Sequence, residues 1–87
     1  MTLRGRVRRW TVRLAPGAAV DFVAADWADA LVVVKRGELE VECRSGRRAR
    51  FAAGAVLTFA GLPVRRLHNP HPEPVVLSLV ARRSPDR

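Results

Sequence analysis

The chain has 87 residues, enough for one small domain, and a formal net charge of +8, with Lys35 as the lone lysine beside fifteen arginines. A single cysteine excludes an intrachain disulfide and fits a reducing compartment, and no apolar run reaches the about eighteen residues that a membrane-spanning helix needs. We therefore expect one cytoplasmic domain over residues 1–87, with 83–87 as a frayed tail and no membrane contact.

Alternation of apolar and basic residues dominates the N-terminal segment and predicts strands. The apolar positions are odd in residues 3–7 and even in residues 10–14, so the parity changes near Arg8–Arg9. One extra residue there, a β-bulge, would keep both apolar sets on the core side and would leave the arginines at 4, 6 and 8 facing outward. Because no apolar segment follows these basic residues, we expect no secretory signal.

The next two segments differ in character. Residues 20–24 (VDFVA) are a short strand candidate, and residues 23–30 (VAADWADA) are Ala-rich but too short to form a helix unaided. Residues 31–34 (LVVV) are apolar without alternation, which predicts a strand covered on both faces. A second sheet could cover one face and a second copy of the chain the other, so we expect a homodimer.

The segment from Gly37 to Gly54 is predicted to be a hairpin with its glutamates on the outer face and Leu39, Val41 and Cys43 on the inner face. A three-residue loop at 45–47 would place Glu42 opposite Arg50 on the outer face. Further strands are predicted at 55–60, 64–69 and 75–83, with the Pro-rich stretch between the last two as a loop. Many short strands with regular turns predict an all-β antiparallel sandwich or barrel.

The order of these parts resembles the small cupins over residues 10–82, with Gly37, Gly54 and Asn69 at positions where that family has the same residues. The resemblance implies a double-stranded β-helix, or jelly-roll barrel, in a single domain that is often dimeric. It also implies a pocket inside the barrel.

The metal-ligand positions of that family are substituted in this chain. Laid on the two cupin motifs, Val23 and Ala25 stand at two histidines, Ala30 at the glutamate and Arg65 at the last histidine. Val and Ala side chains have no lone pair, and a guanidinium stays protonated, so none of the four can bind a divalent cation. We predict no metal and no other cofactor.

By the same resemblance, Arg65 points into the barrel mouth, where its planar fork suits a carboxylate or phosphate. Trp27 is a further pocket candidate, together with Val23, Ala25 and Ala30. The alternatives stay open: Arg65 turns out to solvent or pairs with an internal aspartate, and Trp27 and Trp10 serve core or dimer packing.

Other reactive residues have simpler interpretations. His68 should face away from the pocket, because its parity is opposite to that of Arg65, and His71 lies in the Pro-rich loop, so both are predicted at the surface. Cys43 should act as a small inner apolar side chain. No catalytic residue can be assigned.

Three function hypotheses follow. The first is a metal-free cupin-like domain that binds a small organic ligand, with an anionic one held by Arg65, and serves as a binding or accessory module. The alternative is a metal-independent isomerase or cyclase acting on a small metabolite. The lesser alternative is a nucleic-acid-associated basic domain using the arginines at 44, 47, 48 and 50 together with those at 4, 6 and 8. Few aromatic residues accompany them, so we do not expect nucleic acid as a partner.

Overall fold

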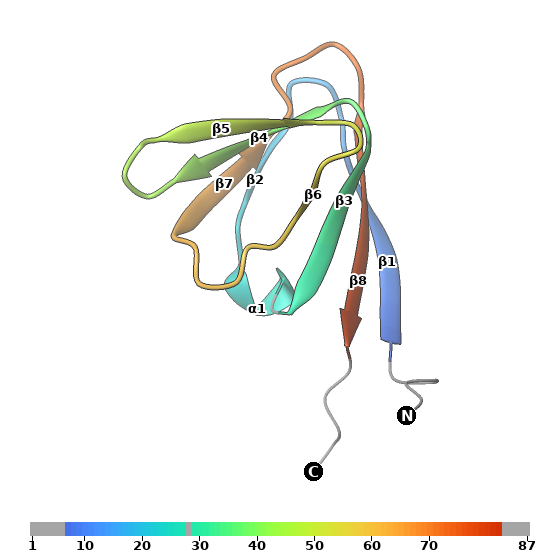
Figure 1. Cartoon of the computed structure of the whole chain (residues 1–87). Helices are drawn as coiled ribbons and strands as arrows, with labels where there is room; N and C mark the ends of the chain where they lie inside the picture. Colours follow the sequence, from blue (N-terminus) through green and yellow to red (C-terminus); the bar gives the residue numbers. More distant parts are fainter. Residues whose placement is uncertain (1–6, 28, 83–87) are drawn as a thin grey trace.

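The computed structural model describes residues 7–27 and 29–82, which form two antiparallel four-stranded sheets facing each other (Figure 1). The β8 sheet has the strand order β1-β8-β3-β6, and the β4 sheet has the order β2-β7-β4-β5. The elements are β1 (Val7–Leu14), β2 (Ala19–Asp21), α1 (Ala24–Trp27), β3 (Ala30–Arg36), β4 (Glu38–Cys43), β5 (Arg48–Ala52), β6 (Val56–Leu57), β7 (Val64–His68) and β8 (Val75–Arg82). The prediction of an all-β jelly-roll is confirmed, while the frayed tail predicted at 83–87 lies outside the described residues.

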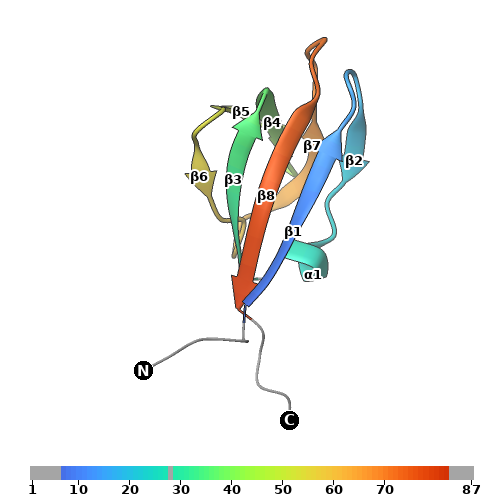
Figure 2. The same cartoon turned by 90° about the vertical axis from the view of Figure 1, so that its right-hand side faces the viewer.

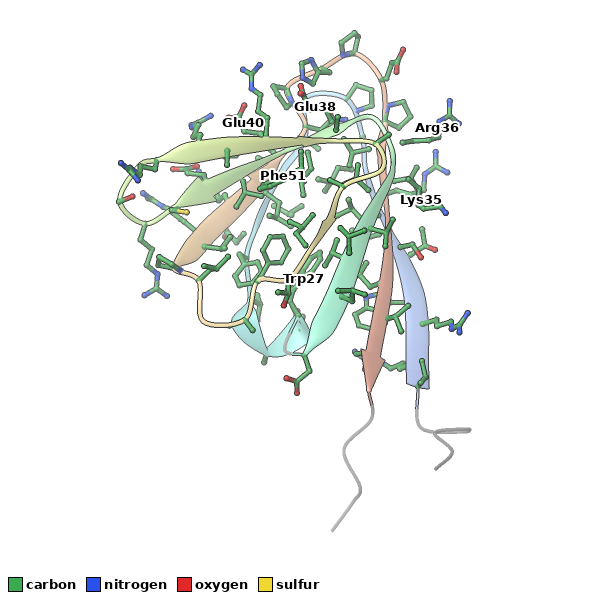
Figure 3. All side chains as sticks on the ribbon, in the orientation of Figure 1. Trp27, Lys35, Arg36, Glu38, Glu40 and Phe51 are labelled. Carbon is green, nitrogen blue, oxygen red and sulfur yellow. The ribbon has the colours of Figure 1, made fainter. Side chains whose placement is uncertain are left out.

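The core lies between the two sheets and is built from the alternate apolar positions of each strand. Leu77 and Leu79 on β8 and Val32 on β3 are completely buried, and Leu39 and Leu67 oppose them from the β4 sheet. Figure 3 shows the inner side chains of both sheets meeting in this space. Burying each such side chain contributes about 1.5–3 kcal/mol, so the alternation of the sequence directly determines which face of each sheet is inside.

Asn69 ties together the loops at one end of the barrel and is fully buried. Its Nδ2 donates to the carbonyl oxygens of Leu14, Ala15 and Glu73 at 3.0, 3.2 and 2.7 Å, and its Oδ1 accepts from the backbone N–H of His71 at 3.1 Å. The side chain thereby satisfies backbone groups from both the β1–β2 turn and the Pro-rich loop.

The β4–β5 hairpin keeps the predicted faces but not the predicted register. The pairs are Leu39 with Phe51, Glu40 with Arg50 and Glu42 with Arg48, and the three-residue loop is 44–46. The prediction of Glu42 opposite Arg50 is therefore wrong. Because the shift amounts to two residues, every side chain stays on its predicted side of the sheet.

The β-bulge predicted at Arg8–Arg9 is wrong. Strand β1 pairs with β8 without interruption from Val7 to Leu14. The even-numbered residues therefore face the inner side along the whole strand, from Arg8 to Leu14. Val7 is 39% exposed rather than inward, and Arg8 lies on the same face as Trp10. The arginine that was predicted to face solvent thus belongs to the inner side of β1, beyond the end of the core.

Strand β3 is covered on one face by the β4 sheet, as its apolar composition predicts. Its other face, with Leu31 48% exposed and Val33 half-buried, belongs to the outer surface of the β8 sheet. Figure 2 views this surface, with β3, β8 and β1 side by side. Val56 and Val80 lie beside β3 on the same side, with Ser78 next to Val33, so the centre of the outer surface is uncharged and largely apolar.

The Ala-rich segment forms a single helical turn, α1, and the strand predicted at 20–24 is limited to Ala19–Asp21. A four-residue helix is far too short to cross a bilayer, and no other helix occurs in 7–27 or 29–82. The turn nevertheless positions Trp27, its last residue, whose ring packs against those of Phe22 and Phe59. Helix α1 itself lies at the end where the two sheets diverge (Figure 1).

We expect Gly37→Ala to lower the free energy of unfolding of the domain far more than Gly17→Ala does. Both glycines have positive φ, 76° and 77°, which costs an alanine about 1–2 kcal/mol. A Cβ at Gly37 would lie 2.6 Å from the carbonyl oxygen of Pro74, whereas a Cβ at Gly17 would meet nothing within 4 Å. Urea unfolding should show a loss of about 3 kcal/mol or more for Gly37→Ala, and equal losses for the two variants would contradict the close approach.

The homodimer stays a prediction, and the surface that a second copy would cover is the apolar outer face of the β8 sheet. We expect sedimentation equilibrium to give a dimer for the wild type and a monomer for Leu31→Glu, because a buried unpaired carboxylate is costly. Leu62→Glu is the matched control, since Leu62 is 53% exposed but lies outside the sheets. A wild type that is monomeric at micromolar concentration would contradict the prediction.

Candidate functional site

Three aromatic rings fill the open end of the barrel, where a ligand pocket was expected. The ring centroids of Phe22 and Trp27 are 5.8 Å apart, those of Phe22 and Phe59 5.3 Å, and those of Trp27 and Phe59 5.5 Å. Trp27 and Phe59 are 8% and 4% exposed. Stacked and edge-to-face contacts at these separations are favourable beyond the area they bury, so this aromatic cluster is a packed plug. The three rings also border a hollow of about 360 Å³, together with Asp29 and Leu62.

Arg65 lies outside the barrel, and the expectation that it points into the mouth is wrong. Val64 and Leu67 are both buried although they are three residues apart, and the pairing of β7 with β4 shifts between Glu42 and Cys43. This irregularity places an extra residue in β7 and reverses the parity of Arg65. Its side chain is 56% exposed, and its Nη1 lies 4.0 Å from Glu42 on the outer face of the β4 sheet.

That outer face carries a network of ion pairs. Arg48 Nη1 donates to Glu40 at 2.6 Å, Arg50 Nε donates to the same carboxylate at 3.3 Å, and His68 Nε2 lies 2.7 Å from Glu42 Oε1. Glu40 is 4% exposed because these arginines lie over it, and Figure 3 shows it on the outer side of β4. The hydrogen bond from Arg48 holds the pKa of Glu40 below its usual value, and the hydrogen bond with His68 does the same for the pKa of Glu42.

The remaining predicted pocket residues are separated from one another. Trp27 and Ala25 come together on α1. Val23, just before that helix, is 51% exposed, and Ala30 is buried at the start of β3. The five residues predicted to line a pocket therefore do not form one site. Of these five, Ala25 and Trp27 border surface hollows in the described part of the chain.

The residues at the family's metal-ligand positions do not fit a metal. Val23, Ala25 and Ala30 offer no donor atom, and Arg65 is a cation on the outer face of a different sheet. Across residues 7–27 and 29–82, no three His, Cys, Asp or Glu side chains are grouped so that they could hold an ion. No step that depends on a metal can therefore be built from this set of side chains.

His68 faces away from the barrel interior, as predicted, and is hydrogen-bonded to Glu42. His71 is paired with Glu38 beside the Pro-rich loop. Cys43 is partly buried on the inner face of β4. These three residues lie apart from the aromatic plug, at the outer face, the far end and the hairpin respectively, and none of them completes a reactive arrangement with another.

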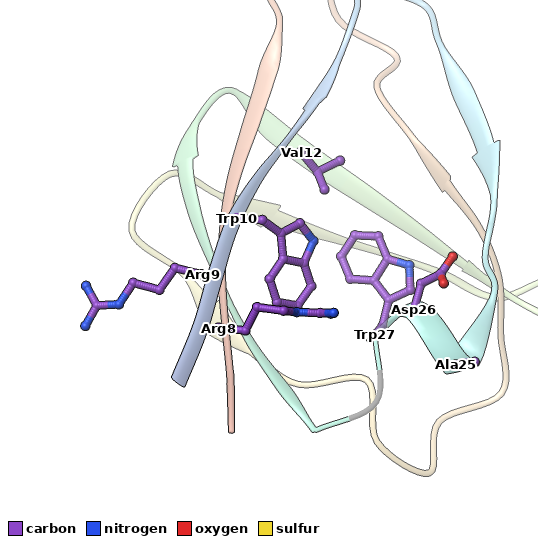
Figure 4. A pocket seen from close by; sticks show the side chains of 7 residues that line it. All are labelled: Arg8, Arg9, Trp10, Val12, Ala25, Asp26 and Trp27. Carbon is purple, nitrogen blue, oxygen red and sulfur yellow. The ribbon is translucent and has the colours of Figure 1, made fainter. Parts of the chain in front are cut away.

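A cleft of about 540 Å³ lies between β1 and α1, directly outside the aromatic plug. Its lining residues are Arg8, Arg9, Trp10, Val12, Ala25, Asp26 and Trp27. Figure 4 shows the indoles of Trp10 and Trp27 side by side, with the Arg8 side chain next to them and Arg9 directed to the opposite side of β1. The Arg8 guanidinium carbon is 4.2 Å from the centroid of the Trp10 ring, which is a cation–π contact.

Sequence reasoning named two residues of this cleft as pocket candidates, Trp27 and Ala25, and missed Arg8 and Asp26. The signal was present: Arg8, Trp10 and Val12 have the same parity, so an unbroken strand puts all three on one face. The assumed bulge separated Arg8 from Trp10, and nothing in the sequence brings Asp26 next to β1.

No protein-family model and no curated protein matches the sequence, whereas several solved structures share its fold. The Cupin_2 domain of an XRE family transcriptional regulator from Enterobacter cloacae superposes with a TM-score of 0.71 and 24% identity, over 93% of this chain and 84% of that one. A cupin domain from Bordetella pertussis gives 0.65 and 20%, over 93% and 85%. A cupin-superfamily sugar phosphate isomerase from Silicibacter pomeroyi gives 0.68 and 21%, over 93% of this chain but 53% of that protein.

We expect the ion pairs on the β4 sheet to make stability depend on pH. The folded-state pKa of Glu40 lies below its ordinary value of 4.5, so its contribution is complete above that value and is lost as the pH falls through the folded pKa. Glu40→Gln should be less stable than the wild type by about 1–2 kcal/mol near neutral pH. Urea unfolding should show this difference shrinking as the pH falls below 4.5, the ordinary pKa of the carboxyl group. A difference independent of pH would contradict the charged pair.

Proposed function

We propose that this chain, which has the fold of a small cupin domain, is a binding or accessory module for a small organic anion and works without a metal. The resemblance expected from the order of its strands is confirmed for the fold. The site we propose is the cleft between β1 and α1, since the barrel interior is occupied by the protein's own rings.

The observation that carries this proposal is the combination of apolar plates and one cation in the same cleft. The indoles of Trp10 and Trp27 supply rigid apolar surface, and the guanidinium of Arg8 supplies a planar set of donors. The volume of about 540 Å³ lies within the range of small-molecule sites. An anion is favoured because, among residues 7–27 and 29–82, no carboxylate forms an ion pair with Arg8.

Nothing specific favours the enzyme hypothesis over binding. The residues that line the cleft include a single carboxylate, Asp26, and no imidazole, cysteine or hydroxyl. General acid–base catalysis needs a positioned group that titrates near the working pH. One structural neighbour is named a sugar phosphate isomerase. The side chains that line the cleft nevertheless give no support to the isomerase or cyclase alternative for this chain.

The nucleic-acid hypothesis loses much of its basis. Arg48 and Arg50, two of the seven arginines it relied on, are paired with Glu40, and Arg66 Nε donates to Asp21 at 2.9 Å. Each pairing removes positive charge that phosphate binding would require. The β4 sheet consequently presents a mixed rather than a uniformly basic surface.

We expect native mass spectrometry of the protein from its own cells to show the chain with a small organic molecule and without a stoichiometric transition metal. The physical reason is the donor set: apolar plates and a guanidinium bind an organic anion, whereas the substituted ligand positions hold no cation. Elemental analysis of the same sample provides the metal count. One equivalent of a transition metal, or a protein that carries no organic ligand and binds none, would contradict the proposal.

A further inference from the structure

We propose that the ligand of the β1–α1 cleft is a planar aromatic monocarboxylate, with its ring against the indoles of Trp10 and Trp27 and its carboxylate on Arg8. This inference rests on the proposed function, because it specifies the class of organic anion that the cleft takes. The observation behind it is the arrangement of four side chains in the cleft. Two come from β1 and two from α1: Arg8, Trp10, Asp26 and Trp27.

The two indoles favour a planar ligand. Trp27 is held by the aromatic cluster, with Phe22 stacked at an interplanar angle of 27° and Phe59 edge-on at 74°, so its orientation is fixed by packing. Trp10 is half-buried on the inner side of β1, next to Trp27 (Figure 4). Aromatic rings prefer aromatic neighbours over saturated ones of equal size, because the ring quadrupoles add to the apolar contact.

Arg8 is oriented for a carboxylate before any ligand arrives. Its guanidinium lies over the Trp10 ring at 4.2 Å, which restricts a side chain that would otherwise be mobile. A guanidinium stacked on a ring by its face keeps its N–H groups at the edge, where they can donate to both oxygens of one carboxylate. A ligand whose aromatic ring lies against the indoles therefore places its carboxylate at the edge of the Arg8 guanidinium.

The charge around the cleft limits the ligand to one negative group. Strands β1, β3, β6 and β8 contain no Asp or Glu, and their charged residues are all basic, so the β1 side attracts an anion. Asp26, on α1, lines the other side of the cleft. A second carboxylate at that end would face a like charge, whereas a hydroxyl or amino group there could donate to Asp26.

The chain provides its own reporters for this site. It has two tryptophans, and both line the cleft. In a ¹⁵N-labelled sample each gives one indole N–H resonance, so binding can be followed at the site itself. The four probes are 4-hydroxybenzoate, the saturated cyclohexanecarboxylate, the dianion terephthalate and the uncharged benzamide.

We expect 4-hydroxybenzoate to shift both indole resonances and each of the other three probes to bind at least about tenfold more weakly. Arg8→Gln should weaken 4-hydroxybenzoate by about tenfold or more, since a charge-assisted pair is lost. Arg13→Gln is the matched control: it removes the same charge from an exposed position of the same strand, and Arg13 is not among the residues that line the cleft. It should change the affinity by no more than about twofold.

The outcomes separate this inference from the proposed function. If cyclohexanecarboxylate or terephthalate binds as tightly as 4-hydroxybenzoate, the planar monoanion is wrong while a small-anion cleft remains. If Arg8→Gln and Arg13→Gln weaken binding equally, the attraction comes from net charge and the assignment of Arg8 is wrong. If no probe shifts either resonance and the native protein carries no organic molecule, both proposals fail. Dispersed amide spectra of each variant establish that it is folded.

Discussion

The packing of Phe22, Trp27 and Phe59 at the open end of the barrel is the constraint on which this account depends. In a jelly-roll of this size the interior can be filled by side chains or can hold a small ligand. Here the three rings lie 5.3 to 5.8 Å apart and fill that end. The binding site that we propose is therefore outside the plug, where Trp27 also borders a cleft with Trp10 and Arg8. One tryptophan thus serves both the core and the candidate site.

Charge is distributed unevenly between the two sheets, and this decides which arginines are available to a ligand. On the β4 sheet, Glu40 and Glu42 engage Arg48, Arg50 and Arg65, so guanidinium groups there are largely compensated. The strands of the β8 sheet contain no carboxylate residue at all. These pairs hold Arg65 on the outer face of the β4 sheet, which leaves Arg8 as the cation beside the aromatic rings.

Much of the fold could be predicted from the sequence because strand alternation depends on local residues alone. The faces of β4 and β5 follow from short patterns. Gly37 and Asn69 are noted only through the cupin resemblance, and the burial of Asn69 is found in the structure. The positions of the bulges do not follow from short patterns, because one extra residue reverses a whole strand and several placements satisfy the same pattern. In β7 the buried Val64 and Leu67 lie three residues apart, which was the signal that Arg65 is turned outward. The contact of Asp26 with the β1 cleft is a tertiary arrangement that no local pattern encodes.

A crystal structure of the ligand-free protein tests the central claim most directly. The account predicts that the rings of Phe22, Trp27 and Phe59 occupy the barrel end with centroids within about 6 Å of one another. It also predicts that the Arg65 guanidinium lies beside Glu42 on the outer face of the β4 sheet. An open chamber inside the barrel, with the aromatic rings apart and the Arg65 side chain directed into it, would contradict the account and return the candidate site to the interior.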